Sequence, residues 1–372
     1  MTGALELAPG VPEGPDSYRF HTADGAASPG SFRTAELLLL RSLHGAAPGD
    51  HLSVQSNYGV VGVGLAASAA SVRMTEANAR RATLCRRNAA ENGADAHTAI
   101  VADLARLSRR YDTASYAPES HTPIAVGKQR IADALATLHP GGRLFVAAAE
   151  GAGGSRYADC LRELTGDCRT VASADGCAVY ATERPAEFEP PQYVEPTRFT
   201  ARIDGVALPL VTLPGMFAAG HLDHGTRLLA ATATVADGDR VLDLCCGAGP
   251  LGIYAARTAD CSVTLTDDSR IATRAAGCSL RAAGVDGRVV TADGVAGVAD
   301  ERFDRVLCNP PTHAGDAVLS SLLGGVSRVL AGGGVLLVVH HRDLDLRPHL
   351  RGYRSVSERA TGEEHVVVAA RR

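Results

Sequence analysis

The chain repeats itself once, at an offset of about 190 residues, and this duplication constrains its fold more than any other feature. GDHLSVQSNYGVVGVGLAAS, which begins at Gly49, matches GDRVLDLCCGAGPLGIYAAR, which begins at Gly238. SVRMTEANARRATLCRRNAAENGA from Ser71 matches SVTLTDDSRIATRAAGCSLRAAGV from Ser262 in the same way. A period of this length is that of a whole domain, so we expect two copies of one domain rather than a solenoid.

Each copy alternates short runs of Val, Leu and Ile with longer helical stretches rich in Ala, Arg and Leu. This pattern predicts an α/β fold with two tandem doubly wound, Rossmann-like domains. The Pro- and Glu-rich segment ATERPAEFEPPQYVEPTRF interrupts both copies, and the alternating residues that follow it predict a hairpin. We therefore expect a first domain over residues 1–182, a linker and hairpin over 183–212, and a second domain over 213–372.

Composition narrows the class of protein. Hydrophobic residues make up 45% and charged residues 21%, the balance of a globular chain. No apolar run approaches the roughly 20 residues of a membrane-spanning helix, and the first residues lack the features of a signal peptide, so we expect a cytoplasmic protein without a membrane partner. The nine scattered cysteines show no metal-ligand spacing, which predicts no metal. With a net charge of -4, any contact with nucleic acid must come from a local patch.

A glycine-rich turn in the second copy favours a nucleoside site. In VLDLCCGAGPLG an apolar strand turns on Gly247 and Gly249 and runs into a helix near Pro250, and such turns let a ligand approach the backbone at the carboxyl end of a strand. Asp243 sits in this turn and the third glycine of a dinucleotide-binding loop is missing, which disfavours a redox cofactor. No phosphate-binding GKS or GKT follows.

Further acidic residues stand at the ends of the next strands. Asp267 ends the strand after Asp243, where a carboxylate can accept both ribose hydroxyls, and Asp293 closes GRVVTAD, where it could accept from an adenine amino group. Each aspartate alone is explained equally well as a helix cap or a turn residue as by a role in nucleoside binding. Together they favour a cationic, phosphate-free nucleoside, because carboxylates repel phosphate, and S-adenosylmethionine is the commonest such cofactor.

The segment CNPPTH follows the apolar strand FDRVL and carries the predicted chemistry. An exocyclic or amide nitrogen is a poor nucleophile, so its hydrogens must be held by acceptors that aim its lone pair at the methyl group. The Asn309 side-chain oxygen and the Pro310 carbonyl can do this by positioning and electrostatics, while Pro310 and Pro311 fix the loop. The alternative is a rigid turn after a strand.

Here the sequence resembles a known family. The segments DLCCGAG, TDDS, NPPTH and LPGMFAAGHLDHGTRLL together resemble the ribosomal RNA guanine-N2 methyltransferases of the RsmC and RlmG group, whose chains also carry two tandem methyltransferase-like domains. The resemblance implies S-adenosylmethionine as cofactor and ribosomal RNA or a ribosomal subunit as partner, and we expect a monomer. From the residues and the resemblance together, the predicted cofactor residues are Phe217, Asp223, Gly225, Thr226, Asp243, Cys245, Gly247, Gly249, Asp267, Asp268, Asp293 and Asn309. The predicted catalytic residues are Asn309, Pro310, Pro311 and His313.

The sequence departs from this family at one position. The family usually has Phe or Tyr after NPP, an aromatic that stacks on the flipped base, whereas this chain has Thr312. Base stacking on an aromatic is worth about 1–3 kcal/mol. Either another group stacks, with His313 the first candidate, or the substrate differs. Thr312 and His313 are accordingly predicted to contact the substrate.

The first copy has lost the chemical positions of the second. Aligned by the repeat, the residues at the positions of Asp243, Gly247, Gly249 and Asn309 are Val54, Tyr58, Val60 and Ala117. This predicts no cofactor binding or catalysis in residues 1–182, which would bind substrate or hold the active domain.

Arginines on a helix of the first copy form a candidate nucleic-acid contact. ARRATLCRRNAAEN places Arg80, Arg81 and Arg87 on a helix surface, where they could bind phosphate, although an ordinary solvated face explains them too. For the whole protein, methylation of a guanine N2 in ribosomal RNA is the leading hypothesis. Methylation of a protein glutamine amide is a second, and a non-catalytic RNA-binding or ribosome-assembly protein with a vestigial site is a third.

Overall fold

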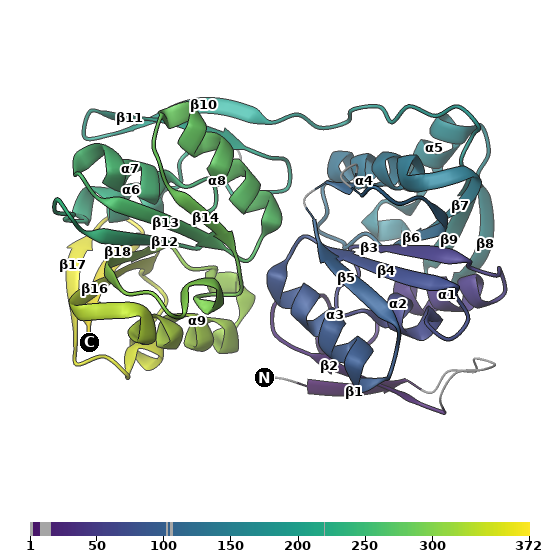
Figure 1. Cartoon of the computed structure of the whole chain (residues 1–372), viewed down its shortest axis with the longest axis horizontal. Helices are drawn as coiled ribbons and strands as arrows, with labels where there is room; N and C mark the ends of the chain where they lie inside the picture. Colours follow the sequence, from purple (N-terminus) through teal and green to yellow (C-terminus); the bar gives the residue numbers. More distant parts are fainter. Residues whose placement is uncertain (1–2, 8–15, 102, 105–106, 219) are drawn as a thin grey trace. The chain divides into compact units, whose positions relative to one another are not determined.

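The computed structural model describes residues 3–7, 16–101, 103–104, 107–218 and 220–372. The chain divides into two compact units, Met1–Glu195 and Pro196–Arg372 (Figure 1). Position 219, inside the quoted segment LPGMFAAGHLDHGTRLL, lies outside the described residues.

Unit 1 is built around a mixed sheet with the strand order β5-β4-β3-β6-β7-β9-β8, in which β3 to β7 are parallel and β9 runs antiparallel to its neighbours β7 and β8. A separate hairpin, β1 with β2, precedes it. The strands are β1 (Gly3–Leu7), β2 (Tyr18–Thr22), β3 (Asp50–Val54), β4 (Ser71–Glu76), β5 (Ala96–Ile100), β6 (Tyr111–Tyr116), β7 (Leu138–Ala149), β8 (Arg169–Ala174) and β9 (Cys177–Glu183). The helices are α1 (Thr34–His44), α2 (Val60–Leu65), α3 (Ala79–Glu91), α4 (Ile124–Thr137), η2 (Glu150–Ala152) and α5 (Gly154–Thr165).

Unit 2 repeats this plan with the order β14-β13-β12-β15-β16-β18-β17. Its strands are β10 (Thr197–Ile203), β11 (Val206–Thr212), β12 (Arg240–Leu244), β13 (Ser262–Asp267), β14 (Arg288–Thr291), β15 (Phe303–Cys308), β16 (Leu330–His341), β17 (Ser355–Thr361) and β18 (His365–Arg371). Its helices are α6 (His224–Thr232), α7 (Pro250–Thr258), α8 (Arg270–Ala283), η3 (Ala296–Val298), η4 (Thr312–Ala314), α9 (Asp316–Val329) and η5 (Arg347–Leu350). The matching strand orders confirm the predicted duplication and the α/β fold class.

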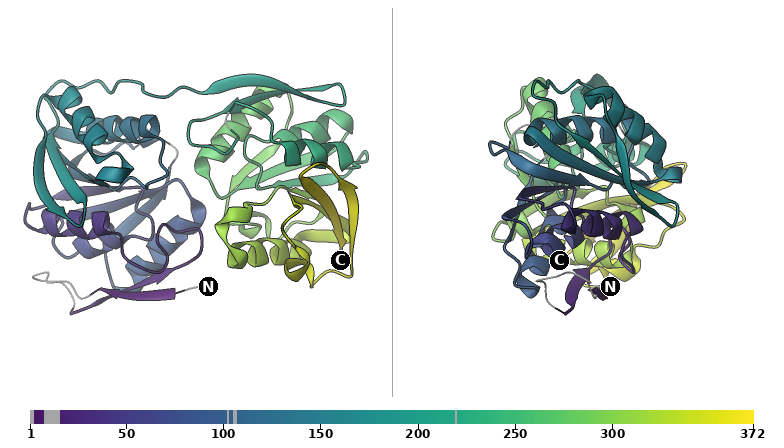
Figure 2. Two further views of the ribbon diagram at one scale, coloured as in Figure 1. Left: turned by 180° about the vertical axis from the view of Figure 1, so that it is seen from behind. Right: turned by 90° about the vertical axis from the view of Figure 1, so that its right-hand side faces the viewer.

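In each unit the sheet lies between two layers of helices (Figure 1 and Figure 2). The reason is the alternation of apolar side chains along the strands, which sends successive residues to opposite faces. In β12, for example, Val241 packs with α6, α7 and α8, whereas Leu242 and Leu244 pack with α9. Over the described part of the chain, every helix is too short or too polar to cross a lipid bilayer.

The order of the strands places a crevice at the carboxyl end of β12. The chain leaves β12 through α7 to reach β13 on one side, and it later places β15 on the other side. At such a switch point the loops after neighbouring strands separate, and ligands of doubly wound sheets bind there.

The β10–β11 hairpin belongs to unit 2, and the alternating residues after the Pro-rich segment form it. Its strand β11 packs against α7 and α8: the Arg257 Nη1 donates to the Ala207 carbonyl over 2.8 Å, and the Val211 amide donates to Ser279 Oγ over 2.9 Å. Arg257 lies in the last turn of α7, which starts at the carboxyl edge of the sheet and runs away from it. β11 therefore runs from the opposite edge back toward the crevice.

Candidate active site

The turn after β12 has the backbone conformation that its glycines allow. Cys245, Gly247 and Gly249 have φ values of 61°, 53° and 84°, in the left-handed region that favours glycine. A Cβ on Gly249 would lie 2.6 Å from the Leu265 side chain, so helix and strand pack closely there. A Cβ on Gly247 would meet nothing within 4 Å, which leaves open space beside the backbone. The turn thus contains one glycine that is needed for close packing, Gly249, and one that faces open space, Gly247.

Asp267 closes this turn from the next strand. Its Oδ2 accepts from the Gly247 amide over 3.0 Å and its Oδ1 accepts from the Ser269 amide over 2.9 Å. Burial and the neighbouring Asp268 raise the pKa of Asp267 to about 6. At neutral pH the side chain is a fixed carboxylate whose remaining lone pairs can accept ribose hydroxyls. Asp293 lies half-buried just beyond β14, the strand beside β13.

Asp243 is fully buried on β12 and has one oxygen to spare. Its Oδ2 accepts from the Gly252 amide over 2.8 Å, whereas its Oδ1 is buried without a hydrogen-bond partner among the described residues. Burial raises the pKa of Asp243 to about 8. An unpartnered buried acceptor is costly unless a ligand satisfies it, and a positively charged ligand would do so best. This orphaned oxygen fits the ammonium and sulfonium charges of S-adenosylmethionine.

The Asn309 side chain is held in one orientation. Its Nδ2 donates to Asp223 Oδ2 and to Thr226 Oγ1, each over 2.9 Å. Because both amide hydrogens have partners, Oδ1 is left as the acceptor. Asn309 follows β15 at the carboxyl edge, next to the turn after β12. The structure therefore brings Asp223, Thr226 and Asn309 together.

The N-terminus of α6 is shaped for this contact. Asp223 is the N-cap of α6, and its Oδ2 also accepts from the Thr226 amide over 2.9 Å. A Cβ on Gly225 would lie 3.2 Å from that oxygen and 2.9 Å from His365 Cδ2. Gly225 is thus required by close packing on both sides.

The loop after Asn309 turns at once into a short 3-10 helix. Pro310 is buried, and the Ala314 amide donates to the Pro311 carbonyl over 2.9 Å. Thr312 is half-buried and His313 is exposed. Phe217, on the loop before α6, has 74% of its surface exposed.

The structure corrects the register of the first copy by one residue. Gln55, Asn57 and Gly59 have φ values of 52°, 58° and 95°, the same series as Cys245, Gly247 and Gly249. The backbone hydrogen bonds agree, since the Ser56 and Cys246 amides donate to the Thr75 and Thr266 carbonyls respectively. The residues at the positions of Asp243, Gly247 and Gly249 are therefore Ser53, Asn57 and Gly59, and the earlier pairing with Val54, Tyr58 and Val60 is wrong.

Unit 1 also keeps an acid that the sequence comparison overlooked. The Asn57 amide donates to Glu76 Oε1 over 2.6 Å, the contact that Gly247 makes with Asp267. SVRMTE and SVTLTD end on these two acids, so the signal was present in the aligned segments. Burial raises the pKa of Glu76 to about 7.

An arginine occupies the amine-binding end of unit 1. Arg33 is the N-cap of α1, the position that Asp223 has on α6. Its guanidinium donates to the Ala117 carbonyl over 3.2 Å and to the Pro118 carbonyl over 2.6 Å. These carbonyls follow β6 as Asn309 and Pro310 follow β15, so the acceptors of this site are already used within unit 1.

Arg81, which the sequence suggested as a phosphate contact, instead binds a carboxylate of its own unit. Its guanidinium binds both oxygens of Glu119, and the two side chains are only 16% and 13% exposed. Although burial would raise the pKa of Glu119, Arg81 offsets this and lowers it. Arg81 follows β4 and Glu119 follows β6, so the pair crosses the end of β3 that lies between them. Arg80 is half-exposed and Arg87 is exposed.

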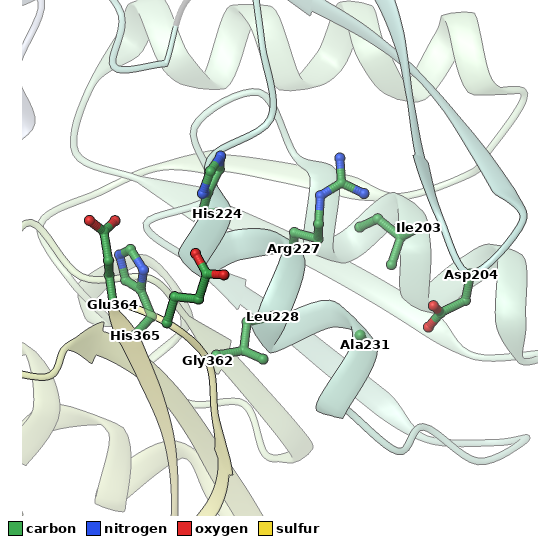
Figure 3. Close-up of a pocket in the computed structure, with 10 residues that line it drawn as sticks. Ile203, Asp204, His224, Arg227, Leu228, Ala231, Gly362, Glu364 and His365 are labelled. Carbon is green, nitrogen blue, oxygen red and sulfur yellow. The ribbon is translucent and has the colours of Figure 1, made fainter.

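A cavity of about 500 Å³ lies beside this site, along the outer face of α6. Its described lining includes His224, Arg227, Asp204, Glu364 and His365, as Figure 3 shows. Its described lining contains none of the predicted cofactor and substrate residues. Among the described residues, no group of three or more His, Cys, Asp or Glu side chains is placed to hold a metal ion.

Comparisons with known proteins agree with this arrangement. The model of the methyltransferase small domain family matches residues 17–181 and again residues 207–369. A Pseudomonas aeruginosa protein named ribosomal RNA small subunit methyltransferase C is 34% identical over 248 residues, which cover 64% of this chain and 73% of that protein. An Escherichia coli protein of the same name is 31% identical over 212 residues, covering 55% of this chain and 60% of that protein.

A solved structure has the same fold over the whole chain. It is a 16S rRNA N2 methyltransferase of T. thermophilus in complex with AdoMet and guanosine, with a TM-score of 0.82 and 24% sequence identity. The match covers 100% of this chain and 98% of the other. Both units, not only the second, therefore follow that architecture.

Proposed function

Because this chain belongs to the ribosomal RNA small subunit methyltransferase C family, within the methyltransferase small domain family, we propose that its unit 2 methylates the N2 amino group of a guanine in small-subunit ribosomal RNA. S-adenosylmethionine supplies the electrophilic methyl group when bound. The RNA, as a chain or within the subunit, is the partner that this activity requires. We further propose that the protein acts as a monomer in the cytoplasm, where ribosomal subunits assemble.

The fixed amide of Asn309 supports this proposal most directly. With Nδ2 committed to Asp223 and Thr226, Oδ1 can accept one hydrogen of the guanine amine. The Pro310 carbonyl can accept the other, so the nitrogen lone pair is directed away from both. Held in this way, a weakly nucleophilic amine is presented to an electrophile without a strong base.

The acids of the crevice would hold the cofactor. Asp267 would accept the ribose hydroxyls, and the buried Asp243 Oδ1 would satisfy a positive charge. Gly247 leaves room for the ligand beside the backbone. Asp293, near the end of β14, would accept from the adenine amino group.

Unit 1 would serve binding or support rather than catalysis. Ser53 stands at the position of Asp243, and Arg33 uses the carbonyls that would accept an amine. We therefore propose that residues 1–195 bind no cofactor and that unit 1 contacts RNA or stabilises the catalytic unit.

The decisive experiment is methylation of ribosomal RNA from cells that lack this protein. Purified protein, S-adenosylmethionine and undermethylated small subunits should yield N2-methylguanosine, measured by mass spectrometry of nucleosides. Asn309→Ala should lose turnover while its cofactor affinity, measured by calorimetry, stays near that of the wild type. Methylated glutamine in a protein substrate, or no heat of cofactor binding, would overturn the proposal.

A further inference from the structure

One aromatic side chain of this protein is presented to solvent, and it belongs to the loop before α6. The chain has seven phenylalanines, nine tyrosines and no tryptophan, all within the described residues. Of these, Phe217 alone is exposed, at 74% of its surface. Exposing a large apolar ring is unfavourable by roughly 2 kcal/mol relative to burial, so a ring that finds no partner within its own domain is suited to an external one.

The path of the chain carries the loop of Phe217 from the end of β11 to the residue that contacts Asn309. β11 runs between α7 and α8 toward the carboxyl edge of the sheet, and the chain next meets the site at Asp223, bonded to Asn309. α7 and α8 lie on the side of β13, whereas α6 packs on β16 and β18. The described residues 213–218 and 220–222 therefore belong to the connection between the carboxyl edge at β11 and the N-terminus of α6 beside Asn309.

The loop itself is held in place by its own hydrogen bonds. The Gly220 amide donates to Thr212 Oγ1 over 3.1 Å, and the Leu213 amide donates to Met216 Sδ over 3.2 Å. The Met216 amide also donates to the Leu213 carbonyl over 3.2 Å. Phe217 follows this turn directly. Its ring is thus carried on an anchored loop.

We propose that Phe217, which the family resemblance placed among the cofactor residues, instead supplies the aromatic face on which the target base stacks, in place of the side chain after Pro311, which here is Thr312. This inference rests on the proposed function. Thr312 has no π face, and His313 belongs to a short 3-10 helix that leads away into α9. The loop of Phe217 ends at Asp223, the residue that orients Asn309.

The test compares variants of Phe217 that differ in one property at a time. Phe217→Ala should lower kcat/KM for small-subunit RNA by about 5- to 150-fold, the range expected from loss of one base–aromatic stack. Phe217→Leu keeps apolar area but no ring and should be nearly as defective, whereas Phe217→Tyr should stay close to the wild type. Cofactor affinity in the absence of RNA should remain within about twofold throughout.

Rescue separates stacking from any other role of the ring. Thr312→Phe, placed in the Phe217→Ala background, should recover much of the lost kcat/KM because it restores an aromatic at the family's usual position. His313→Ala should lower kcat/KM less than Phe217→Ala does. Val356→Ala, at a residue of unit 2 that is 40% exposed, is the matched control for removing exposed apolar surface and should change nothing.

Three outcomes would overturn the inference. Phe217→Ala could weaken cofactor binding as much as it lowers kcat/KM, which would make the ring a cofactor contact. Phe217→Leu could keep full activity, or Phe217→Ala could have no effect on RNA methylation. If the wild type methylates no RNA, the proposed function fails separately. The stack is then judged from the affinity of the cofactor-bound protein for guanosine, which Phe217→Ala should weaken and Phe217→Tyr should not.

Discussion

The side-chain amide of Asn309 donates to Asp223 Oδ2 over 2.9 Å, and this contact ties the loop after β15 to the N-terminus of α6. The same carboxylate oxygen caps α6 through the Thr226 amide. Orientation of the acceptor oxygen of Asn309 is thereby coupled to the start of a helix.

Replacing Asp223 should therefore impair turnover more than cofactor binding. A hydrogen bond to a charged group is worth about 1.5–3 kcal/mol, so Asp223→Ser should lower kcat by about 10- to 150-fold. Serine still caps the helix but does not reach Asn309, which separates positioning from helix stability. Asp223→Asn, which keeps both acceptor contacts, should lose less. Single-turnover rates and cofactor calorimetry check this, and a Ser variant with wild-type kcat would contradict it.

Cofactor binding should depend on pH through Asp243. The pKa of this buried carboxyl is about 8 in the free protein, and a cationic ligand beside it favours the carboxylate. Affinity should therefore rise as pH increases from 6 to 8, with uptake of the ligand releasing a proton. The α-amino group of the cofactor titrates in the same range, so the informative quantity is the difference from Asp243→Asn. Calorimetry in buffers of unequal ionisation heat measures it, and equal proton release by both proteins would refute the role of Asp243.

Asp243 should also make the free energy of unfolding fall as pH rises when no cofactor is bound. Burial raises the folded-state pKa of Asp243 from its ordinary value of 3.8 to about 8, so its stabilising contribution is complete below about pH 4 and is lost as pH rises through 8. Asp243→Asn keeps an acceptor for the Gly252 amide and does not titrate. As pH increases from 5 to 9, the melting temperature of Asp243→Asn should rise relative to that of the wild type. Parallel melting curves over this range would contradict the prediction.

Much of the fold could be predicted because apolar runs predict strands regardless of which residues occupy the turns between them. The strand-end acids of unit 2 and the loop at Asn309 followed from the same pattern. The register of the first copy could not be set in this way, because two apolar strands can slide by one residue without a visible cost in sequence. In the folded chain the positive φ at Asn57 and Gly59 fixes the register, and only the backbone reveals it.

The sequence also did not predict which residues far apart in the chain contact one another. Helical spacing places Arg81 near the surface of α3, but it carries no information about Glu119, which lies 38 positions away. The exposure of Phe217 was equally hidden, since an apolar residue in a loop is as often buried as exposed. Both features depend on how distant segments meet.

One chain should bind one molecule of cofactor. Asp267→Ala should abolish the heat of binding, because it removes the acceptor in the crevice that faces open space at Gly247. Glu76 occupies the equivalent position in unit 1, and Glu76→Gln should leave the binding isotherm unchanged, since Ser53 lacks the carboxylate of Asp243 and the Arg81–Glu119 pair crosses the end of β3. Calorimetric stoichiometry distinguishes these cases. Two sites per chain, or a loss of affinity in Glu76→Gln, would show that unit 1 still binds cofactor.

Charge reversal on α3 should separate structure from RNA contact. Arg81→Glu places a carboxylate against Glu119 in a site that is 13% exposed, and breaking such a pair is costly because an uncompensated charge remains buried, so unit 1 should melt at a lower temperature. Arg87→Glu changes an exposed side chain and should leave the melting temperature unaltered. If α3 contacts phosphate, only Arg87→Glu should weaken RNA binding without loss of stability, and the slope of log affinity against log salt should become shallower by about one. Unchanged RNA affinity in Arg87→Glu would remove α3 from the RNA-binding surface.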